Sequence, residues 1–104
     1  MSTLDSQQKK PLRSIGHKLN PVVTVSDNGL SEGVMAELER ALEDHELIKV
    51  KLNVGDPAAR KAVAADICEQ TGAALAQSIG KVALLYRAAK KPNPKLSNLL
   101  RVIG

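Results

Sequence analysis

The chain of 104 residues carries a net charge of +4 and is long enough for one domain with a single core, but too short for two domains. It has no Trp or Phe and one tyrosine, Tyr86, so its core must be aliphatic, and it lacks the aromatic platforms on which single-stranded bases usually stack. The single cysteine, Cys68, excludes an internal disulfide and leaves too few ligands for a cysteine-based metal site, so we expect a small buried or half-buried thiol.

The first predicted element is a short helix over residues 11–19, with Leu12, Ile15 and Leu19 on one face. We place Pro11 in its first turn, because a proline inside the helix would cost about 3 kcal/mol. The segment before it lacks the apolar stretch of a signal peptide, and no window of the sequence matches a membrane span. We therefore expect a soluble, cytoplasmic protein without a membrane partner.

A β-branched run, residues 21–25, predicts the first strand, which leads into a tight polar corner at residues 26–29. Ser31 is then a good N-cap for a helix that ends near Asp44. The corner is compatible with simple chain reversal or with a phosphate cradle, in which backbone N–H groups at a helix N-terminus bind the anion. The outer face of the helix should point away from any nucleic acid because it is acidic, with Glu37, Glu39 and Glu43.

The alternation in residues 46–53 predicts a second strand with one buried side and one open, basic side. Lys49 and Lys51 point to the open side, together with Leu47. A third helix follows, with Asp56 as N-cap and Gly72 as its C-terminal stop. Its first helical residue is Pro57, and its predicted inner face consists of Ala59, Ala62, Val63 and Ile67.

Two further runs of strand character, residues 73–79 and 82–87, are separated by Gly80 and Lys81. Glycine at the first central position suits a type II′ turn, so these strands should pair antiparallel. Residues 89–104 form a basic linker and an apolar end, 96–103, which either docks on the body or binds a partner.

The element order is α-β-α-β-α-β-β, which predicts a single α/β domain over residues 5–88 with a mixed four-stranded sheet. The two strand-helix-strand crossovers are expected to make parallel pairs, and the final hairpin to add an antiparallel strand.

The charges are segregated along the chain. All acidic residues except Asp5 lie between Asp27 and Glu69, whereas basic residues gather in the first twenty residues and after residue 80. If folding brings the two ends together beside the 26–29 corner, they form one strongly positive face, as in nucleic-acid-binding proteins. The alternative is a pair of solvated tails.

Two stretches of the chain resemble the bacterial stand-alone CRM domain of the YhbY type, named for chloroplast RNA splicing and ribosome maturation. They are GHKLNPVVTVSDNGLSEGVMAELERALEDHELIKVKL at residues 16–52 and IGKVALLYR at residues 79–87. The resemblance covers roughly residues 5–88. It implies RNA binding, association with precursors of the large ribosomal subunit, and a fold similar to the C-terminal domain of bacterial translation initiation factor three.

The family's GxxG loop, likened to the RNA-contacting loop of KH domains, maps onto residues 26–29. This chain departs from the pattern at Ser26, which replaces the first glycine and resists positive φ. Asp27 also brings a carboxylate that would repel phosphate unless its side chain caps backbone N–H groups. Pro11 in the first helix is another departure.

Together, the charges and the resemblance predict a monomeric RNA-binding accessory protein of large-subunit assembly, with ribosomal RNA as its partner and without cofactor or metal. The predicted RNA-binding residues are Ser26, Asp27, Asn28 and Gly29 in the corner and Lys9, Lys10, Arg13, Lys18, Lys49, Lys51, Lys81 and Arg87 in a basic patch.

Other interpretations stay open at this point. The lysines of the second strand are also typical of solvated strand residues, and His17, His45 and Tyr86 are read as structural. An enzyme is not expected, because the sequence has no phosphate-loop lysine motif, metal cluster or catalytic carboxylate pair. The alternatives are a protein-interaction module that docks through residues 96–103, and a DNA-binding protein.

Overall fold

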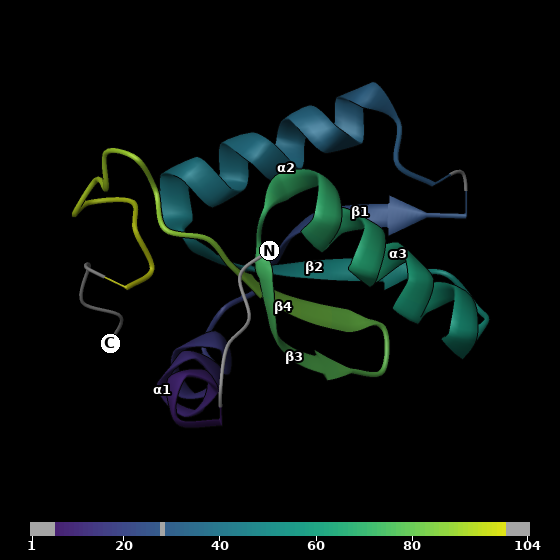
Figure 1. Ribbon diagram of the computed structural model, residues 1–104, viewed down its shortest axis with the longest axis horizontal. Helices are drawn as coiled ribbons and strands as arrows, with labels where there is room; N and C mark the ends of the chain where they lie inside the picture. Colours follow the sequence, from purple (N-terminus) through teal and green to yellow (C-terminus); the bar gives the residue numbers. More distant parts are fainter. Residues whose placement is uncertain (1–5, 28, 100–104) are drawn as a thin grey trace.

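The computed structural model describes residues 6–27 and 29–99, which form a four-stranded sheet with helices packed on it (Figure 1). The elements are, in chain order, α1 (Ser6–Gly16), β1 (Pro21–Ser26), α2 (Glu32–His45), β2 (Leu47–Asn53), α3 (Pro57–Thr71), β3 (Ala74–Ile79) and β4 (Val82–Tyr86). The predicted fold class, α/β with the order α-β-α-β-α-β-β and a mixed sheet, is confirmed. Within these described ranges, none of the helices is long and apolar enough to cross a membrane.

The strands are arranged in the order β1-β2-β4-β3. β1 and β2 run parallel, whereas β4 is antiparallel to both of its neighbours, β2 and β3. The prediction that both crossovers make parallel pairs is therefore wrong for β3, because β4 lies between it and β2. The short turn keeps β3 and β4 paired, so either of them could lie next to β2. Pairing β2 with β4 makes an antiparallel ladder, which is slightly more stable per residue than the parallel ladder that β2 and β3 would form.

The N-terminal end of α2 and both ends of α3 carry the caps that the sequence predicts. Ser31 Oγ accepts a hydrogen bond from Val34 N at 3.2 Å, and the Asp56 carboxylate accepts one from Ala59 N at 3.3 Å. Gly72 ends α3 in the left-handed conformation, with φ of 76°. These bonds satisfy backbone groups that a helix end leaves without partners.

The main core lies between one face of the sheet and the helices α2 and α3. It is aliphatic except for Cys68, whose burial raises the pKa of its thiol, so the expected buried thiol is confirmed. The side chains that are fully buried there include Val25, Leu38, Leu42, Ile48, Val50, Ile67 and Leu85.

The predicted inner face of α3 is only partly correct. The buried residues of the helix are Ala64, Ile67, Cys68 and Thr71, whereas Ala62 is exposed. Small apolar residues surround most of this helix, so its sequence does not define a single stripe, and the packing against the sheet selects the face.

Helix α1 covers part of the opposite face of the sheet. Leu12, with Ile15 and Leu19, packs against a cluster formed by Leu47, Ala76 and Leu84. At the end of the helix, a Cβ atom on Gly16 would lie 2.6 Å from a methyl carbon of Leu84, so glycine is what allows the backbone to come this close.

The predicted position of Pro11 is wrong. α1 begins at Ser6 and ends at Gly16, so Pro11 lies inside the helix rather than in its first turn. Pro11 is past the first turn of α1, so it forfeits the backbone bond to the carbonyl of Gln7 and its ring crowds that carbonyl. Burial of the apolar face of α1 offsets this loss, since a fully buried Leu or Ile side chain contributes about 1.5–3 kcal/mol.

The C-terminal segment docks on the body as far as the structure describes it. Asn98 donates from its backbone N to His45 O at 2.9 Å and from Nδ2 to Leu47 O at 2.6 Å. Ser97 is fully buried, and its Oγ donates to Glu46 Oε1 at 2.7 Å. Of the predicted apolar end, residues 97–99 thus pack on the domain and Leu96 is 40% exposed, while residues 100–103 lie outside the described residues.

Candidate nucleic-acid interface

The acidic and basic residues of the described chain lie in different layers. Across residues 6–27 and 29–99, no acidic residue belongs to α1 or to a strand. The acids are Glu32, Glu37, Glu39, Glu43 and Asp44 on α2, Asp66 and Glu69 on α3, and Asp27, Glu46 and Asp56 in connections. Among the described residues, α1 and the four strands therefore carry no negative side chain of their own.

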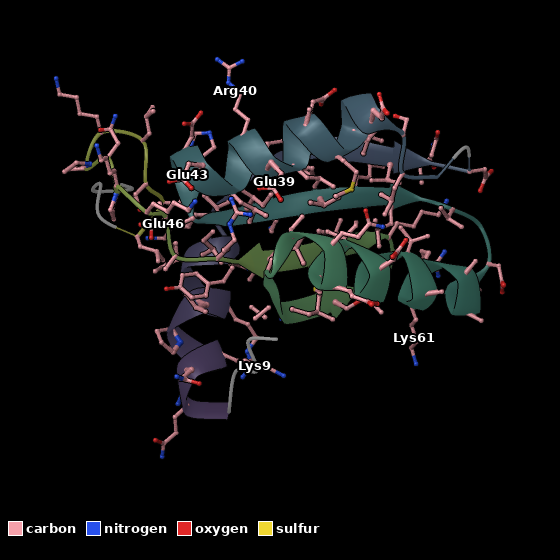
Figure 2. The ribbon with its side chains drawn as sticks, turned by 45° about the horizontal axis from the view of Figure 1, so that its top comes forward. Lys9, Glu39, Arg40, Glu43, Glu46 and Lys61 are labelled. Carbon is pink, nitrogen blue, oxygen red and sulfur yellow. The ribbon has the colours of Figure 1, made fainter. Side chains whose placement is uncertain are left out.

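Helix α1 presents a cationic stripe on the side that faces away from its apolar contacts. Lys10, Arg13, Ser14 and His17 follow one another at helical spacing and, with Gln77 of β3, line one surface hollow. Lys18 is exposed directly after the helix, and Lys9 is half-buried on it (Figure 2).

A second hollow adjoins this stripe on the open face of the sheet. It is lined by His17, Pro21, Lys49, Gln77, Ile79, Val82 and Leu84. Lys51 is exposed and lies two residues beyond Lys49 on β2, so both lysines belong to the open side as predicted. Leu47, the third residue predicted on this side, is instead fully buried under α1.

The corner at residues 26–29 is a chain reversal in this structure. Gly29 N donates to Ser26 O at 3.0 Å, and Gly29 has φ of 82°, a conformation that glycine adopts without strain. Ser26 and Asp27 are exposed, and Asn28 lies outside the described residues. Glu32 in the first turn of α2 already places a negative charge at the helix N-terminus, which weakens the attraction for a further anion.

Two of the predicted cations, Lys51 and Lys81, lie at the same end of the sheet as the corner. Lys51 lies opposite Thr24 in the β1–β2 ladder, close to the end of β1. The carbonyl of Lys81 accepts a hydrogen bond from Leu52 N at 2.6 Å, so the β3–β4 turn lies beside the end of β2. Figure 1 shows the corner and this turn at the same end of the sheet.

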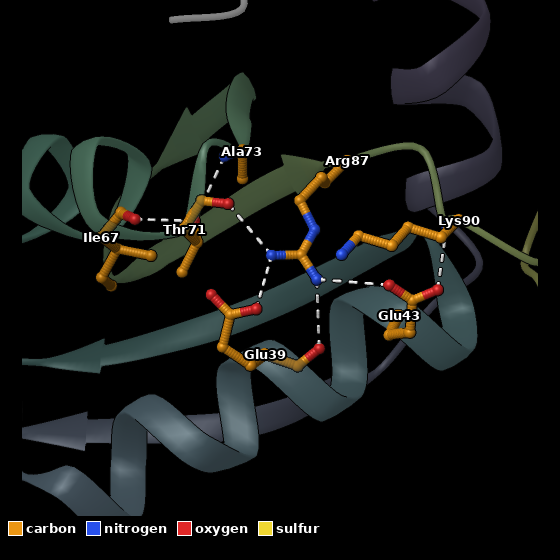
Figure 3. Close-up of polar contacts among 7 residues, drawn as sticks. All are labelled: Glu39, Glu43, Ile67, Thr71, Ala73, Arg87 and Lys90. Atoms are coloured by element: carbon orange, nitrogen blue, oxygen red, sulfur yellow. Dashed lines mark hydrogen bonds and ion pairs between the residues drawn. The ribbon is translucent and has the colours of Figure 1, made fainter.

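Arg87 is separated from the other predicted site residues by its partners (Figure 3). Its guanidinium forms an ion pair with Glu39, at 2.7 Å between Nη1 and Oε2, and lies 3.8 Å from Glu43. Nη1 also donates to Thr71 O at 3.0 Å, and the side chain is 20% exposed. The structure therefore places Arg87 with the acidic helix α2 rather than with the cations of α1 and β2.

The two basic ends of the chain do not converge beside the corner, so this prediction is wrong. Ala89 N donates to Glu46 Oε2 at 2.8 Å and Lys90 N donates to Glu43 Oε2 at 2.9 Å. These bonds hold the C-terminal segment at the end of α2, across the molecule from the corner (Figure 1). The basic residues that follow, Lys90, Lys91 and Lys95, consequently lie away from the 26–29 turn.

Comparison with known proteins identifies the family of the chain. The family model of the CRS1 / YhbY (CRM) domain matches residues 4–87. The chain belongs to this family. The chain is 55% identical over 101 residues to a "Probable RNA-binding protein" of Pseudomonas aeruginosa, with 97% of each chain covered. It is 44% identical to an "RNA-binding protein" of Haemophilus influenzae, with 92% of this chain and 97% of the relative covered.

A solved structure shows the same fold. The solution structure of a hypothetical protein from Staphylococcus aureus, itself a proposed RNA-binding protein, matches with a TM-score of 0.76 and 32% identity. The match covers 85% of this chain and 92% of the other.

Sequence reasoning missed Glu46, which organises one end of this CRM domain. The residue is 5% exposed and has φ of 62°, and its carboxylate accepts hydrogen bonds from Ala89 N and from Ser97 Oγ. No local pattern signals this role, because the partners lie 43 and 51 residues away along the chain.

Two side chains that the sequence analysis reads as structural are engaged in the body of the CRM domain, as predicted. Tyr86 is half-buried and packs against the α1 cluster. His45 Nδ1 lies 2.9 Å from Leu96 O, where it helps to hold the C-terminal segment. Over the described part of the chain, no three His, Cys, Asp or Glu side chains lie close enough together to hold a metal ion.

Proposed function

We propose that this CRM-domain protein binds RNA with the layer formed by α1 and the open face of the sheet. The observation that carries the proposal is the separation of charge between layers: the cations of α1, β2 and the β3–β4 turn have no acid on their own elements. Polyanion binding is driven mainly by such uncompensated Lys and Arg residues. The names of the relatives from P. aeruginosa and H. influenzae agree with RNA as the ligand.

The finer proposal is an accessory protein that binds ribosomal RNA during assembly of the large ribosomal subunit in the cytoplasm, without catalysing a reaction. The family resemblance supports this role, since CRM domains of this type are associated with precursors of the large subunit. A small domain with a cationic layer and no aromatic platform suits contacts with the phosphates of a structured RNA.

In this proposal the 26–29 corner makes a minor contribution. A helix N-terminus contributes about 0.3–1 kcal/mol to the binding of one phosphate, and Glu32 and Asp27 reduce that value here. Most of the affinity must therefore come from the exposed and half-buried cations of this layer. The candidates are Lys9, Lys10, Arg13, Lys18, Lys49, Lys51 and Lys81.

Salt dependence tests this mechanism directly. If about six of these cations neutralise phosphates, the logarithm of the association constant should fall against the logarithm of salt concentration with a slope of roughly −4 to −5.5. Fluorescence anisotropy with a structured fragment of ribosomal RNA measures the slope, and duplex DNA of equal length is the control for specificity. A slope near −1 contradicts the proposal, and stronger binding to the DNA would favour a DNA-binding function.

Sedimentation of a cell extract tests the ribosomal role. We expect the protein to migrate with precursors of the large subunit and to leave them after ribonuclease treatment. A protein that stays at the top of the gradient in growing cells, or that stays on the particles after their RNA is digested, contradicts this part of the proposal.

A further inference from the structure

The open face combines two neighbouring hollows of different chemistry. The first is cationic and is lined by Lys10, Arg13, Ser14, His17 and Gln77. The second contains aliphatic side chains, with Ile79, Val82 and Leu84 beside Lys49. His17 and Gln77 line both hollows, so the two are directly adjacent.

The second hollow exposes an aliphatic surface that the fold leaves uncovered. Ile79 at the end of β3 is 64% exposed, and Val82 lies opposite it in the ladder. The hollow has a volume of about 270 Å³, just below the roughly 300–1,000 Å³ of sites that hold drug-sized ligands. This volume is sufficient for one planar base.

The polar groups at the shared wall match the needs of a base. The amide of Gln77 offers both a donor and an acceptor, which is what the edge of a nucleobase requires. The imidazole of His17 provides the kind of flat surface on which RNA-binding proteins stack bases. Lys10 and Arg13 lie on the other side of this wall, where the phosphate of the same nucleotide would be.

We propose that the two hollows together bind one unpaired RNA nucleotide, with its phosphate on Lys10 and Arg13 and its base on Ile79 and Val82. The inference rests on the proposed RNA binding and adds a preference for RNA that contains an unpaired base. The cationic stripe argues for a nucleotide as the occupant, because an apolar peptide would gain nothing from two cations that form no ion pair within the described residues. In a duplex the bases are stacked inside and cannot enter the hollow.

The test compares variants of the full chain against two RNA ligands of equal length, one single-stranded and one fully paired, over a range of salt concentrations. Ile79→Ser removes the apolar surface, and Val22→Ser is the matched control because Val22 is 50% exposed on β1 and does not line this hollow. Arg13→Gln removes a phosphate contact, and Lys61→Gln on α3 is the control for charge (Figure 2). Gln77→Ala is a second variant, at the wall that the two hollows share. Circular dichroism melting tests whether each variant is folded.

We expect Ile79→Ser to weaken single-strand binding roughly three- to tenfold with an unchanged salt slope, since it removes apolar burial alone. Arg13→Gln should reduce the magnitude of the slope by about 0.7 on a single strand. The controls Val22→Ser and Lys61→Gln should each change the affinity for single-stranded RNA less than Ile79→Ser and Arg13→Gln do. Equal losses on single-stranded and paired RNA, or wild-type affinity of both Ile79→Ser and Gln77→Ala, would overturn the nucleotide site while leaving RNA binding intact. If the wild-type protein binds neither RNA, the proposed function fails as well.

Discussion

The two faces of the sheet differ in what their charged residues contact. On the face covered by α2 and α3, aliphatic side chains are fully buried, and the acids of α2 bind Arg87 and the backbone of the C-terminal segment. On the other face, α1 covers only part of the sheet, and the cations of α1 and β2 have no acidic neighbour on their own elements. A basic residue is available to an RNA phosphate only where no carboxylate already neutralises it.

Arg13 and Arg87 illustrate this difference. Both were predicted to bind RNA from their charge, yet one lines an exposed hollow and the other forms an ion pair with Glu39 and bonds to the Thr71 carbonyl. Their side chains are chemically identical, so the comparison separates the effect of position from the effect of charge. The four predictions that follow test this contrast between the covered face and the open face.

The largest effect is expected for the buried core. Ile67→Ala on α3 removes a side chain that is completely buried in the covered face, so the free energy of unfolding should fall by about 2–5 kcal/mol. Ile79→Ala on the open face is the matched control, and it should cost less than about 1 kcal/mol because Ile79 is 64% exposed. Urea denaturation measures both, and equal losses would contradict the assignment of the two faces.

A smaller loss is expected for Glu46→Ala. The substitution leaves the buried Ser97 O–H without its acceptor, which costs about 1–3 kcal/mol, whereas the part-buried Ala89 N–H can bond to water instead. Hydrogen exchange should show faster exchange at Ala89 and Asn98 as the C-terminal segment loosens. Glu37→Ala, at an exposed position of α2, is the control and should leave stability and exchange unchanged. Unaltered exchange in the Glu46 variant would mean that other contacts hold the segment.

The two arginines should respond in opposite ways to substitution by Gln. Arg87→Gln should reduce the free energy of unfolding by about 0.5–1 kcal/mol and leave the salt slope of RNA binding unchanged. Arg13→Gln should leave stability within about 0.5 kcal/mol and lower the magnitude of the slope by about 0.7–0.9. Denaturation and anisotropy on the same preparations measure the pair. A reduced slope in the Arg87 variant would show that the ion pair with Glu39 opens when RNA binds.

The smallest effect is expected at the corner. Asp27→Asn removes a negative charge near the proposed path of the RNA, and a pair of like charges about 6 Å apart in water costs roughly 0.7 kcal/mol. The affinity for RNA should therefore rise by up to about threefold at low salt, and the gain should disappear at high salt. Glu37→Gln, on the acidic helix, is the control for net charge. If both variants gain equally, the effect comes from total charge and the corner lies away from the RNA.

Local signals in the sequence predicted most of the elements correctly. The caps at Ser31 and Asp56 and the turn at Gly80 each depend on residues within a few positions of one another, so the sequence contains all the information that they need. The lysines of β2 were placed on the open side for the same reason, by simple alternation. The start of α1 was missed because the penalty for Pro11 was judged locally, whereas the burial of Leu12 that offsets it depends on β2, β3 and β4.

The candidate site was predicted less completely, because availability for binding is a property of neighbours that lie far apart in the chain. Lys10 and Arg13 lie together with Gln77, and no local pattern connects these residues. The ion pair that separates Arg87 from the other predicted cations has no local signal either, since its partner Glu39 lies 48 residues earlier in the chain.

By itself, the sequence determined the order of helices and strands, the family and the aliphatic nature of the core, because these depend on residue type and on short-range periodicity. Only the tertiary structure decided that β4 lies beside β2, that Glu43 and Glu46 hold the C-terminal segment at the end of α2, and that an apolar hollow adjoins the cations of α1. The physical reason is that these features arise from contacts between segments separated by tens of residues. Such contacts are selected by the packing of the whole domain and not by any one segment.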